Sequence, residues 1–308
     1  MWETPGIAVM FSYISVPGGE LFEGDPRGLL KRSILDLENE GFGLNTGPEL
    51  EYFYITQENG FYEPFGSGEY FDLPPLDPTE DIKMETMMCL EAAGFQLDKV
   101  HHEAAKGQQE INFRYADALK TADNVLLYKL AVKTIAQKHG KLATFMPKPF
   151  WGVNGSGCHV HQSLVDLDTG ENIFSDPDMP AGLSQKGINY IGGILDHAQG
   201  VAMLKAGMEG MSKKREPIEP TSDNIYHMSE AERDEKSVGM LPEHLGEAVD
   251  HFVKDALVSE SLGGYISKNL VELKTREFEE YNEFTGKSWQ ESRPAITSWE
   301  LDRYLVRC

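Results

Sequence analysis

The sequence predicts an α+β protein in which strands and helices alternate first and helices alone follow. Two patterns support this prediction. Up to about residue 184, short strand-like runs are separated by segments of helical periodicity. Beyond that point the apolar residues recur only at helical spacing. The 308 residues are enough for a sizeable core in one or two domains.

Glycine, proline and capping residues bound the expected elements. Strands are expected over residues 7–16, 47–56, 96–102, 109–114, 143–147 and 158–164. Helices are expected over residues 25–40, 79–94, 116–139, 184–200, 201–214, 244–259, 261–284 and 298–307. In the second strand, Leu50, Tyr52 and Tyr54 face one side of the sheet, and Glu49 and Glu51 face the other.

The formal net charge of −22 makes the chain strongly acidic, although its 40% of hydrophobic residues is ordinary for a globular protein. Such a surface repels nucleic-acid phosphates and anionic lipid, so we expect neither nucleic acid nor a membrane as a partner. It suits carboxylates gathered around metal ions, but solubility or halophilic adaptation would give the same charge. No apolar run approaches the roughly 18 residues that a membrane span needs.

The three cysteines, Cys89, Cys158 and Cys308, lack the spacing of a metal site and indicate a reducing compartment without disulfides. Residues 7–16 are apolar, but no basic residue precedes them and no small-residue cleavage site follows. A buried strand therefore fits them better than a signal peptide. Both observations favour the cytoplasm.

Glu49 and Glu51 are the first candidate metal ligands, because residues two apart on a strand share one face. An exposed strand could carry such a pair for solubility alone. Here Gly47-Pro48 precedes the pair and aromatic residues follow it, so the strand is expected to be buried. Two buried carboxylates repel each other unless a cation neutralises them.

Glu103 and Glu110 form a second pair, at the junction of two expected strands. Glu103 ends a His-His-Glu triplet, which by itself is common on helical surfaces, and Glu110 ends the sequence Gly-Gln-Gln-Glu. One turn between the strands would bring both carboxylates to one point. Together with the first pair they offer four oxygen ligands, which Mg²⁺ and Mn²⁺ prefer.

A glycine-rich turn at residues 152–157 leads into a strand that carries His159 and His161. Glycines let backbone N–H groups approach an anion closely. The two histidines point the same way, so one could bind a metal while the other meets a nucleotide phosphate. A hairpin turn with two edge-strand histidines is the alternative reading.

Together these elements resemble the catalytic domain of glutamine synthetase, most closely the type I form of bacteria and archaea. The matching stretches are residues 22–27, 47–53, 70–77, 101–103, 107–110, 145–149, 154–163, 206–210, 224–226 and 299–305. The resemblance implies an antiparallel sheet flanked by helices, with a helical C-terminal region. It implies one catalytic domain over residues 1–308, with the sheet and the metal and ATP site in 1–200 and the helical part in 201–308.

The resemblance also implies roles for individual residues. Ligands of the cation that supports ammonium and glutamate binding are Glu51, Glu103 and Glu110. Ligands of the cation on the nucleotide phosphates are Glu49 and His159. Positions around ATP are Asp98, Phe113, His161 and Ser163. The glutamate-binding turn holds Asn154 and Gly155, and Tyr70 lines the ammonium pocket, so Glu103 and Tyr70 are the implied catalytic residues.

The implied reaction uses ATP to phosphorylate the γ-carboxylate of glutamate, and ammonia then displaces phosphate to give glutamine. Two or three Mg²⁺ or Mn²⁺ ions per site are expected to neutralise the transferring phosphoryl group. Family members form double-ring dodecamers, so a homo-oligomer is expected.

Two family segments have no counterpart in the sequence. The chain starts where the catalytic domain would begin, so the N-terminal β-grasp domain is expected to be absent. Residues 192–198 run almost directly into 201–204, where the family has a long stretch carrying the glutamate flap, the phosphate-clamping arginines and a metal carboxylate. An internally deleted gene, an assembled fragment and part of a longer polypeptide all fit this pattern.

Three functions therefore compete. The chain could be a glutamine synthetase, or a γ-glutamyl-polyamine ligase of the same fold. It could also be a catalytically impaired homologue that binds metal and ATP and assembles with complete subunits. The match at residues 70–77 and 154–163 favours ammonium as the amine.

Overall fold

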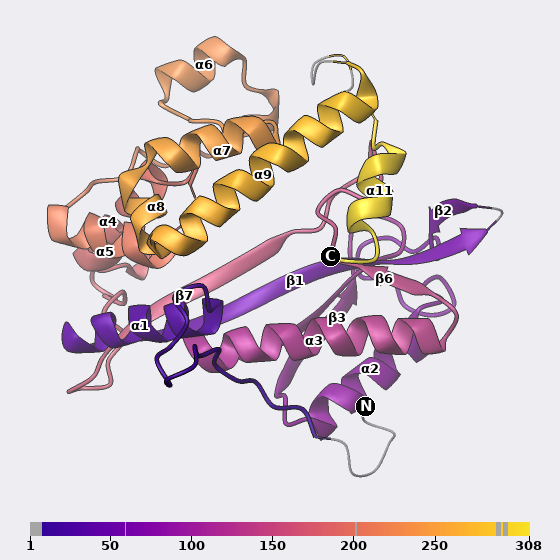
Figure 1. Cartoon of the computed structure of the whole chain (residues 1–308), viewed down its shortest axis with the longest axis horizontal. Coiled ribbons are helices and arrows are strands. Elements are labelled where there is room, and N and C mark those ends of the chain that lie inside the picture. Colours follow the sequence, from indigo (N-terminus) through magenta and orange to yellow (C-terminus); the bar gives the residue numbers. More distant parts are fainter. Residues whose placement is uncertain (1–7, 59, 201, 288–290, 292–294) are drawn as a thin grey trace. The chain divides into compact units, whose positions relative to one another are not determined.

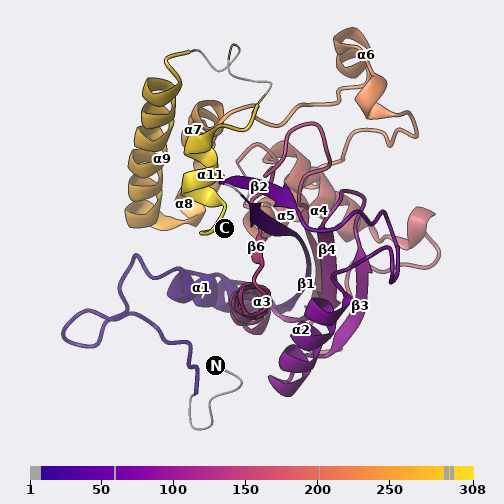
Figure 2. The same cartoon turned by 90° about the vertical axis from the view of Figure 1, so that its right-hand side faces the viewer.

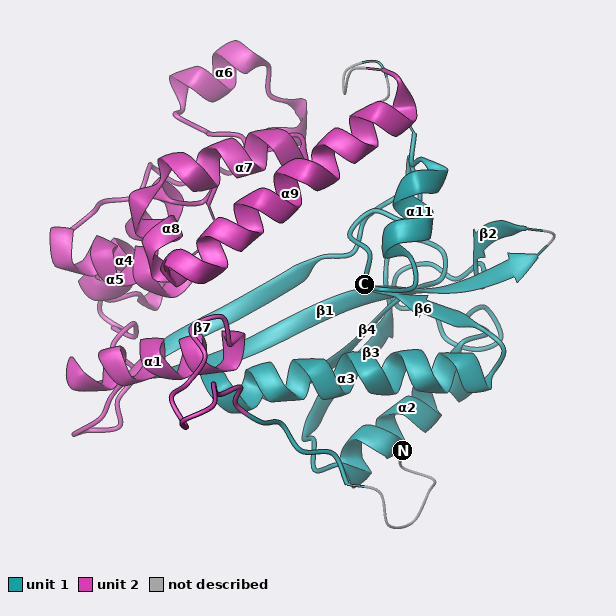
Figure 3. Ribbon diagram, viewed as in Figure 1, with its two compact units in different colours: residues 1–12, 43–163, 291–308 teal, residues 13–42, 164–290 magenta. Residues whose placement is uncertain are grey.

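A computed structural model describes residues 8–58, 60–200, 202–287, 291 and 295–308 (Figure 1). These form two compact units, which Figure 3 colours separately. Unit 1 comprises residues 1–12, 43–163 and 291–308, and unit 2 comprises residues 13–42 and 164–290. The expected division near residue 200 remains a prediction, and residues 291–308 group with the sheet-containing unit.

Unit 1 is built on a sheet centred on β1 (Phe42–Glu58). The hydrogen-bonded order is β2-β1-β4-β3, and β5, β6 and β7 also pair with β1. These strands are β2 (Phe61–Pro64), β3 (Leu97–His102), β4 (Gln108–Phe113), β5 (Ala116–Asp117), β6 (Leu142–Thr144) and β7 (Cys158–Asp166). β1 runs antiparallel to β2, β4, β5 and β6, and β3 runs antiparallel to β4, which confirms the predicted antiparallel sheet.

Helices α2 (Glu80–Ala92) and α3 (Ala118–Lys138) cover one face of this sheet (Figure 2). The core between helices and sheet contains Leu50, Tyr52 and Tyr54 of β1. The alternation predicted for β1 is therefore confirmed, since Phe53 and Ile55 pack in a separate cluster with Leu305, which follows α11 (Ser298–Tyr304). Glu49 and Glu51 belong to the same face as Phe53.

A buried ion pair anchors the segment between β2 and α2. The Asp77 carboxylate accepts a hydrogen bond from the Lys83 ammonium at 2.5 Å, and both side chains are almost fully buried. Burial would raise the pKa of Asp77, but hydrogen bonds from Lys83 and Thr79 outweigh it and lower that pKa. Asp77 thus stays ionised beside Lys83 of α2, and this contact fixes one end of the segment that carries Tyr70.

The strand expected at residues 7–16 is not formed in the part that the structure describes. Residue 7 lies outside the described residues, and residues 8–16 contain only an isolated bridge from Ser15 to Leu21. Met10 is 85% exposed and Ile14 is 53% exposed, so these apolar side chains have no sheet to pack on. The prediction was wrong because apolar composition alone does not supply a pairing partner.

Unit 2 consists mainly of helices, as predicted for the later part of the chain. They are α1 (Pro26–Asn39), α4 (Gln185–Asp196), α5 (Met203–Lys213), α6 (Glu230–Glu235), α7 (Leu245–Lys254), α8 (Ala256–Ser261) and α9 (Gly263–Thr285). Glycine allows α4 and α5 to approach closely, because a Cβ on Gly193 would lie 2.1 Å from the carbonyl oxygen of Ala206. No helix in the described residues is long and apolar enough to cross a membrane.

A histidine joins three helices within unit 2. Nδ1 of His197, just after α4, lies 2.6 Å from Asp255, the N-cap of α8, and Nε2 lies 3.1 Å from Glu209 of α5. Burial alone would lower the pKa of His197, but these two carboxylates raise it above its ordinary value. Both ring nitrogens donate only in the protonated form, so that form holds the three helices together.

We expect this contact to stabilise the fold at low pH and to weaken as pH rises. A histidine whose folded pKa is raised contributes fully below its unfolded pKa of about 6.5 and loses that contribution as pH passes the folded pKa. Replacing His197 with glutamine should therefore cost about 1.5–3 kcal/mol near pH 5.5, as for hydrogen bonds to charged groups, and much less near pH 9. Thermal unfolding of both proteins across this pH range measures the difference, and a pH-independent difference would contradict the assignment.

Candidate active site

Three ionisable side chains form a row across neighbouring strands on the sheet face opposite α2 and α3. Glu51 of β1 stands directly opposite Glu110 of β4, and Glu110 stands directly opposite His101 of β3. Side chains at directly opposed positions share a face and lie roughly 5 Å apart at Cβ. Two opposed carboxylates destabilise a sheet unless a positive charge accompanies them.

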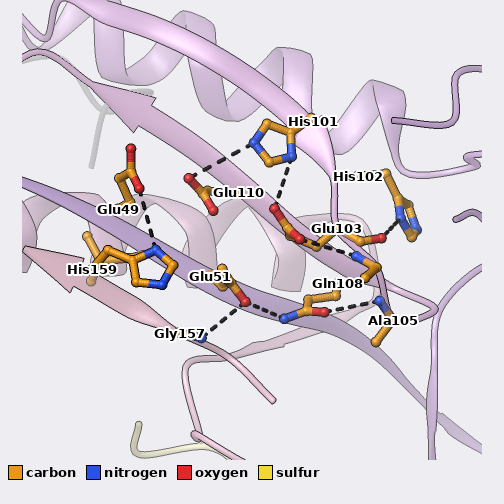
Figure 4. A network of polar contacts seen from close by, with 12 residues as sticks. Glu49, Glu51, His101, His102, Glu103, Ala105, Gln108, Glu110, Gly157 and His159 are labelled. Carbon is orange, nitrogen blue, oxygen red and sulfur yellow. Dashed lines mark hydrogen bonds and ion pairs between the residues drawn. The ribbon is translucent and has the colours of Figure 1, made fainter. Parts of the chain in front are cut away.

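Glu51 is held in place by two hydrogen bonds (Figure 4). Its Oε2 accepts from the Gln108 side-chain amide at 2.5 Å and from the Gly157 backbone N–H at 3.1 Å. Glycine at residue 157 leaves room for this carboxylate, because a Cβ there would lie 2.9 Å from Oε1 of Glu51 and displace it. The turn and Gln108 thus fix one oxygen of Glu51 and leave Oε1 for a ligand.

His101, Glu103 and Glu110 offer donor atoms that all lie within 4.8 Å of one another. Nδ1 of His101 is 3.2 Å from Oε1 of Glu103, and Nε2 is 4.0 Å from Oε1 of Glu110. Burial, followed by the charge of Glu51, raises the pKa of Glu103, although His101 and the hydrogen bond from the Ala104 N–H act to lower it. A cluster of buried carboxylates whose charge is under-compensated fits a divalent cation.

A second group of donors lies further along β1. Oε2 of Glu49 is 3.5 Å from Nδ1 of His159, and Oε1 of Glu49 is 3.3 Å from Nε2 of His161. The His159 and His161 side chains are 65% and 70% exposed, so both rings remain accessible to a ligand. Figure 4 shows Glu49 and His159 on the same side of the strands as Glu51 and Glu110.

A cavity of about 500 Å³ adjoins Glu49 and His161. Asp98 and Arg114 also line it. Phe113 lines it too, but its ring packs in the core at 5.3 Å from Phe95, so only the main chain of Phe113 can meet a ligand. Three of the four expected ATP positions therefore border one cavity.

The family model described as the glutamine synthetase catalytic domain matches residues 23–204 and 200–304 of the chain. The glutamine synthetases of Methanosarcina mazei and Thermococcus kodakarensis are 35% and 36% identical to it, over 98% and 99% of this chain. The chain belongs to the glutamine synthetase family. Membership of this family implies the use of ATP and of divalent cations.

The alignments also show that this glutamine synthetase family member is shorter than its relatives. The chain spans 79% of the M. mazei protein, and the alignment of 368 positions is longer than the chain of 308 residues. The family match breaks into two stretches that meet at residues 200–204. The chain is thus shorter than its relatives, and the family match breaks where the motifs predict a missing segment.

Solved structures support the same fold. A ligand-free structure described as GmaS is 25% identical, with a TM-score of 0.77, and the match covers 92% of this chain and 77% of that one. Plasmodium falciparum glutamine synthetase, at 20% identity, has a TM-score of 0.71 over 93% of this chain and 80% of its own.

The remaining family positions are less closely assembled. Tyr70 is 59% exposed, and its ring centroid lies 5.8 Å from that of His101, so it borders the carboxylate cluster. Asn154 is exposed, and the Gly155 carbonyl accepts a hydrogen bond from Gln108 at 2.9 Å. Ser163 is half-buried on β7 and does not line the cavity at Glu49.

Gln108 was not assigned a role from sequence, although it lies within a matching motif. Its side-chain amide donates to Glu51 and to the Gly155 carbonyl, and its side-chain oxygen accepts from the Ala105 N–H at 3.1 Å. Gln108 is 1% exposed and so ties three segments of the site together. Only the pairing of β4 with β1 reveals this, because Gln108 and Glu51 are far apart in sequence.

Replacing Gln108 with alanine should lower Mn²⁺ affinity by about 10–100-fold, the usual cost of removing a group that orients a metal ligand. Equilibrium Mn²⁺ titration measures this effect. The matched control is Gln137→Ala on the exposed part of α3, which should leave affinity unchanged. Equal affinity of the Gln108 variant and the native protein would contradict the role.

Proposed function

We propose that this chain is an ATP-dependent carbon–nitrogen ligase that joins ammonia to the γ-carboxylate of glutamate. One observation carries the proposal: the carboxylates and histidines expected to bind cations lie on one sheet face beside a cavity lined by positions expected to meet ATP. The similarity to proteins named glutamine synthetase, over nearly the whole chain, supports it.

In the proposed reaction, an oxygen of the γ-carboxylate attacks the γ-phosphorus of ATP, and ADP leaves. The nitrogen of ammonia then attacks the acyl carbon of γ-glutamyl phosphate, inorganic phosphate leaves, and a carboxylate takes the released proton. Glu49 and His159 would hold the cation on the phosphates, and Glu51, Glu103 and Glu110 a second one, with Mg²⁺ or Mn²⁺ in two or three positions. Bound cations would neutralise charge on the phosphoryl group.

Other side chains would bind and orient the substrates. Asp98, His161, Ser163 and the main chain of Phe113 would surround ATP. Asn154 and Gly155 would meet glutamate. Tyr70, beside the carboxylate cluster, would line the ammonium pocket, where negative charge attracts the cationic substrate and Glu103 accepts its proton.

The test is formation of ¹⁵N-labelled glutamine from glutamate, ATP, Mg²⁺ and ¹⁵N-ammonium, detected by mass spectrometry on protein of intact mass 34.5 kDa. Product that requires both ATP and ammonium supports the proposal. Product only with putrescine in place of ammonium would identify a polyamine ligase. Binding of Mn²⁺ and ATP without any product would identify a non-catalytic subunit.

We also infer that the chain assembles with further copies, as the dodecameric family members do. Sedimentation of the purified protein tests this inference, and a monomer at micromolar concentration would contradict it. The cytoplasmic location expected from the cysteines remains a prediction.

A further inference from the structure

His197 has a different carboxylate partner on each side of its ring, and all three residues belong to unit 2, coloured magenta in Figure 3. Nδ1 lies 2.6 Å from Oδ2 of Asp255, and Nε2 lies 3.1 Å from Oε2 of Glu209. A protonated imidazole donates to both carboxylates, whereas a neutral imidazole has one N–H and can donate to one of them. Loss of the proton therefore breaks one contact and keeps the other.

Asp255 is the partner better placed to keep the remaining N–H. Its contact with His197 is the shorter of the two. Oδ1 of Asp255 accepts from the Val258 N–H at 3.2 Å and thereby caps α8, so the carboxylate is held in place from its other side. Among the residues that the structure describes, His197 is the ion-pair partner of Asp255 and has no substitute. Asp255 would therefore be left without a charged partner if the N–H moved to Nε2.

Glu209, by contrast, has a second cationic partner. Its Oε1 accepts from the Lys213 ammonium at 2.6 Å, one turn further along α5, and Lys213, ahead of His197, lowers the pKa of Glu209. When the neutral ring keeps its proton on Nδ1, the lone pair of Nε2 faces Oε2 of Glu209. Two acceptors at this separation repel each other, so the Glu209 carboxylate turns away from His197 and stays with Lys213.

A cavity beside these three residues gives the Glu209 side chain room to move. It has a volume of about 660 Å³. The main chains of α4 and α5 are in close contact here, because a Cβ on Gly210 would lie 2.2 Å from the Asn189 carbonyl oxygen. The side chain of Glu209, rather than its helix, is therefore the part that moves. The other charged or titratable groups that line the cavity are Asp196, Lys213, Arg215, His251 and Lys254.

We propose that His197 is a proton-dependent switch for Glu209: the protonated ring holds the Glu209 carboxylate, and the neutral ring releases it into the cavity while remaining bonded to Asp255. Burial lowers the pKa of His197, but the two carboxylates outweigh it and raise that pKa. Release therefore occurs as pH rises through a value above the ordinary one of about 6.5. The switch lies beside the connection between α4 and α5, where the family match breaks, and makes this connection sensitive to pH. It does not depend on the proposed function.

Solid-state ¹⁵N NMR of the full chain, labelled at its nine histidines, tests the proposal, because the shift of each ring nitrogen reports whether it carries a proton in an assembly of any size. His197→Gln identifies the His197 signals by their loss. We expect both nitrogens to be protonated at about pH 5.5, and only Nδ1 above the midpoint. The control His251→Gln removes the other histidine at the cavity and should leave these signals unchanged. A neutral ring protonated at Nε2, or a ring still doubly protonated at about pH 10, would overturn the proposal.

Two partner variants separate the contacts. Asp255→Ser keeps a residue that caps α8 but shortens the side chain, so the neutral ring should move its proton to Nε2 and donate to Glu209. Glu209→Gln should leave the proton on Nδ1 and lower the midpoint of His197, because one negative charge is lost. A neutral ring that keeps Nδ1 protonated in Asp255→Ser would overturn the proposal.

Double-mutant cycles in urea unfolding give a second readout. The coupling between His197→Gln and Glu209→Gln should be stabilising below the midpoint and lost above it. The coupling between His197→Gln and Asp255→Ser should persist on both sides of the midpoint, because that contact survives deprotonation. Equal coupling of His197 with Glu209 at both pH values would overturn the proposal.

Discussion

Ammonium-dependent phosphate release by this chain is expected to be about 10²–10³-fold slower than that of the M. mazei relative, because the segment expected to carry the phosphate-clamping arginines has no counterpart in the sequence. Phosphoryl transfer depends on cationic groups aimed at the developing charge. Among the described residues around the site, the candidates are Arg114 and Lys148. Lys148 donates a short hydrogen bond to the Val153 carbonyl, which leaves Arg114 as the side chain that borders the cavity.

The comparison needs both enzymes at saturating glutamate, ATP and Mg²⁺, so that differences in binding do not enter. Inserting the relative's segment at residues 200–204 is expected to raise the rate, whereas an unrelated insert of equal length is not. Turnover by the native chain at the relative's rate would mean that Arg114 and the bound cations suffice.

Replacing Glu110 with glutamine should separate metal binding from stability. We expect Mn²⁺ affinity to fall by at least the ~10–100-fold caused by losing a supporting group, because Glu110 is itself a proposed ligand. In metal-free protein the same change should raise the unfolding midpoint by about 1–4 °C, because it relieves the repulsion between Glu110 and Glu51. Function and stability thus oppose each other at this position.

Calorimetry with EDTA and with Mn²⁺ gives both quantities. The native protein should gain stability from Mn²⁺, and the variant should gain little. Glu91→Gln, at an exposed position of α2, is the matched control and should behave as the native protein. A variant that is less stable than the native protein in EDTA would show that Glu110 stabilises the fold in addition to binding the ion.

The sequence predicted side-chain positions best where the prediction depended on one strand alone. The alternation in β1 correctly placed Leu50 and Tyr52 in the core and Glu51 on the opposite face, because side-chain direction has a period of two. The contributions of Gln108 and His101 could not be predicted, because they depend on which residues of β3 and β4 stand opposite each other and opposite β1. Register is a long-range property that local periodicity does not contain.

Phe113 illustrates the reverse limit. Its motif predicts a position beside ATP, and Phe113 does line the cavity at Glu49, but β4 alternation turns its ring toward α2 and α3. A motif identifies a position, whereas the strand decides whether its side chain or its main chain is available.

The row of Glu51, Glu110 and His101 also has a consequence for folding. A slip of β4 by one residue would turn Glu110 toward the tyrosines beneath α2 and α3 and turn Ile111 outward. Burial of an unpaired carboxylate is costly, so the ligands themselves disfavour the misregistered sheet. A cation present while the strands pair adds its binding energy to the correct register alone. Refolding with Mn²⁺ should therefore give a higher yield of native protein than refolding with EDTA.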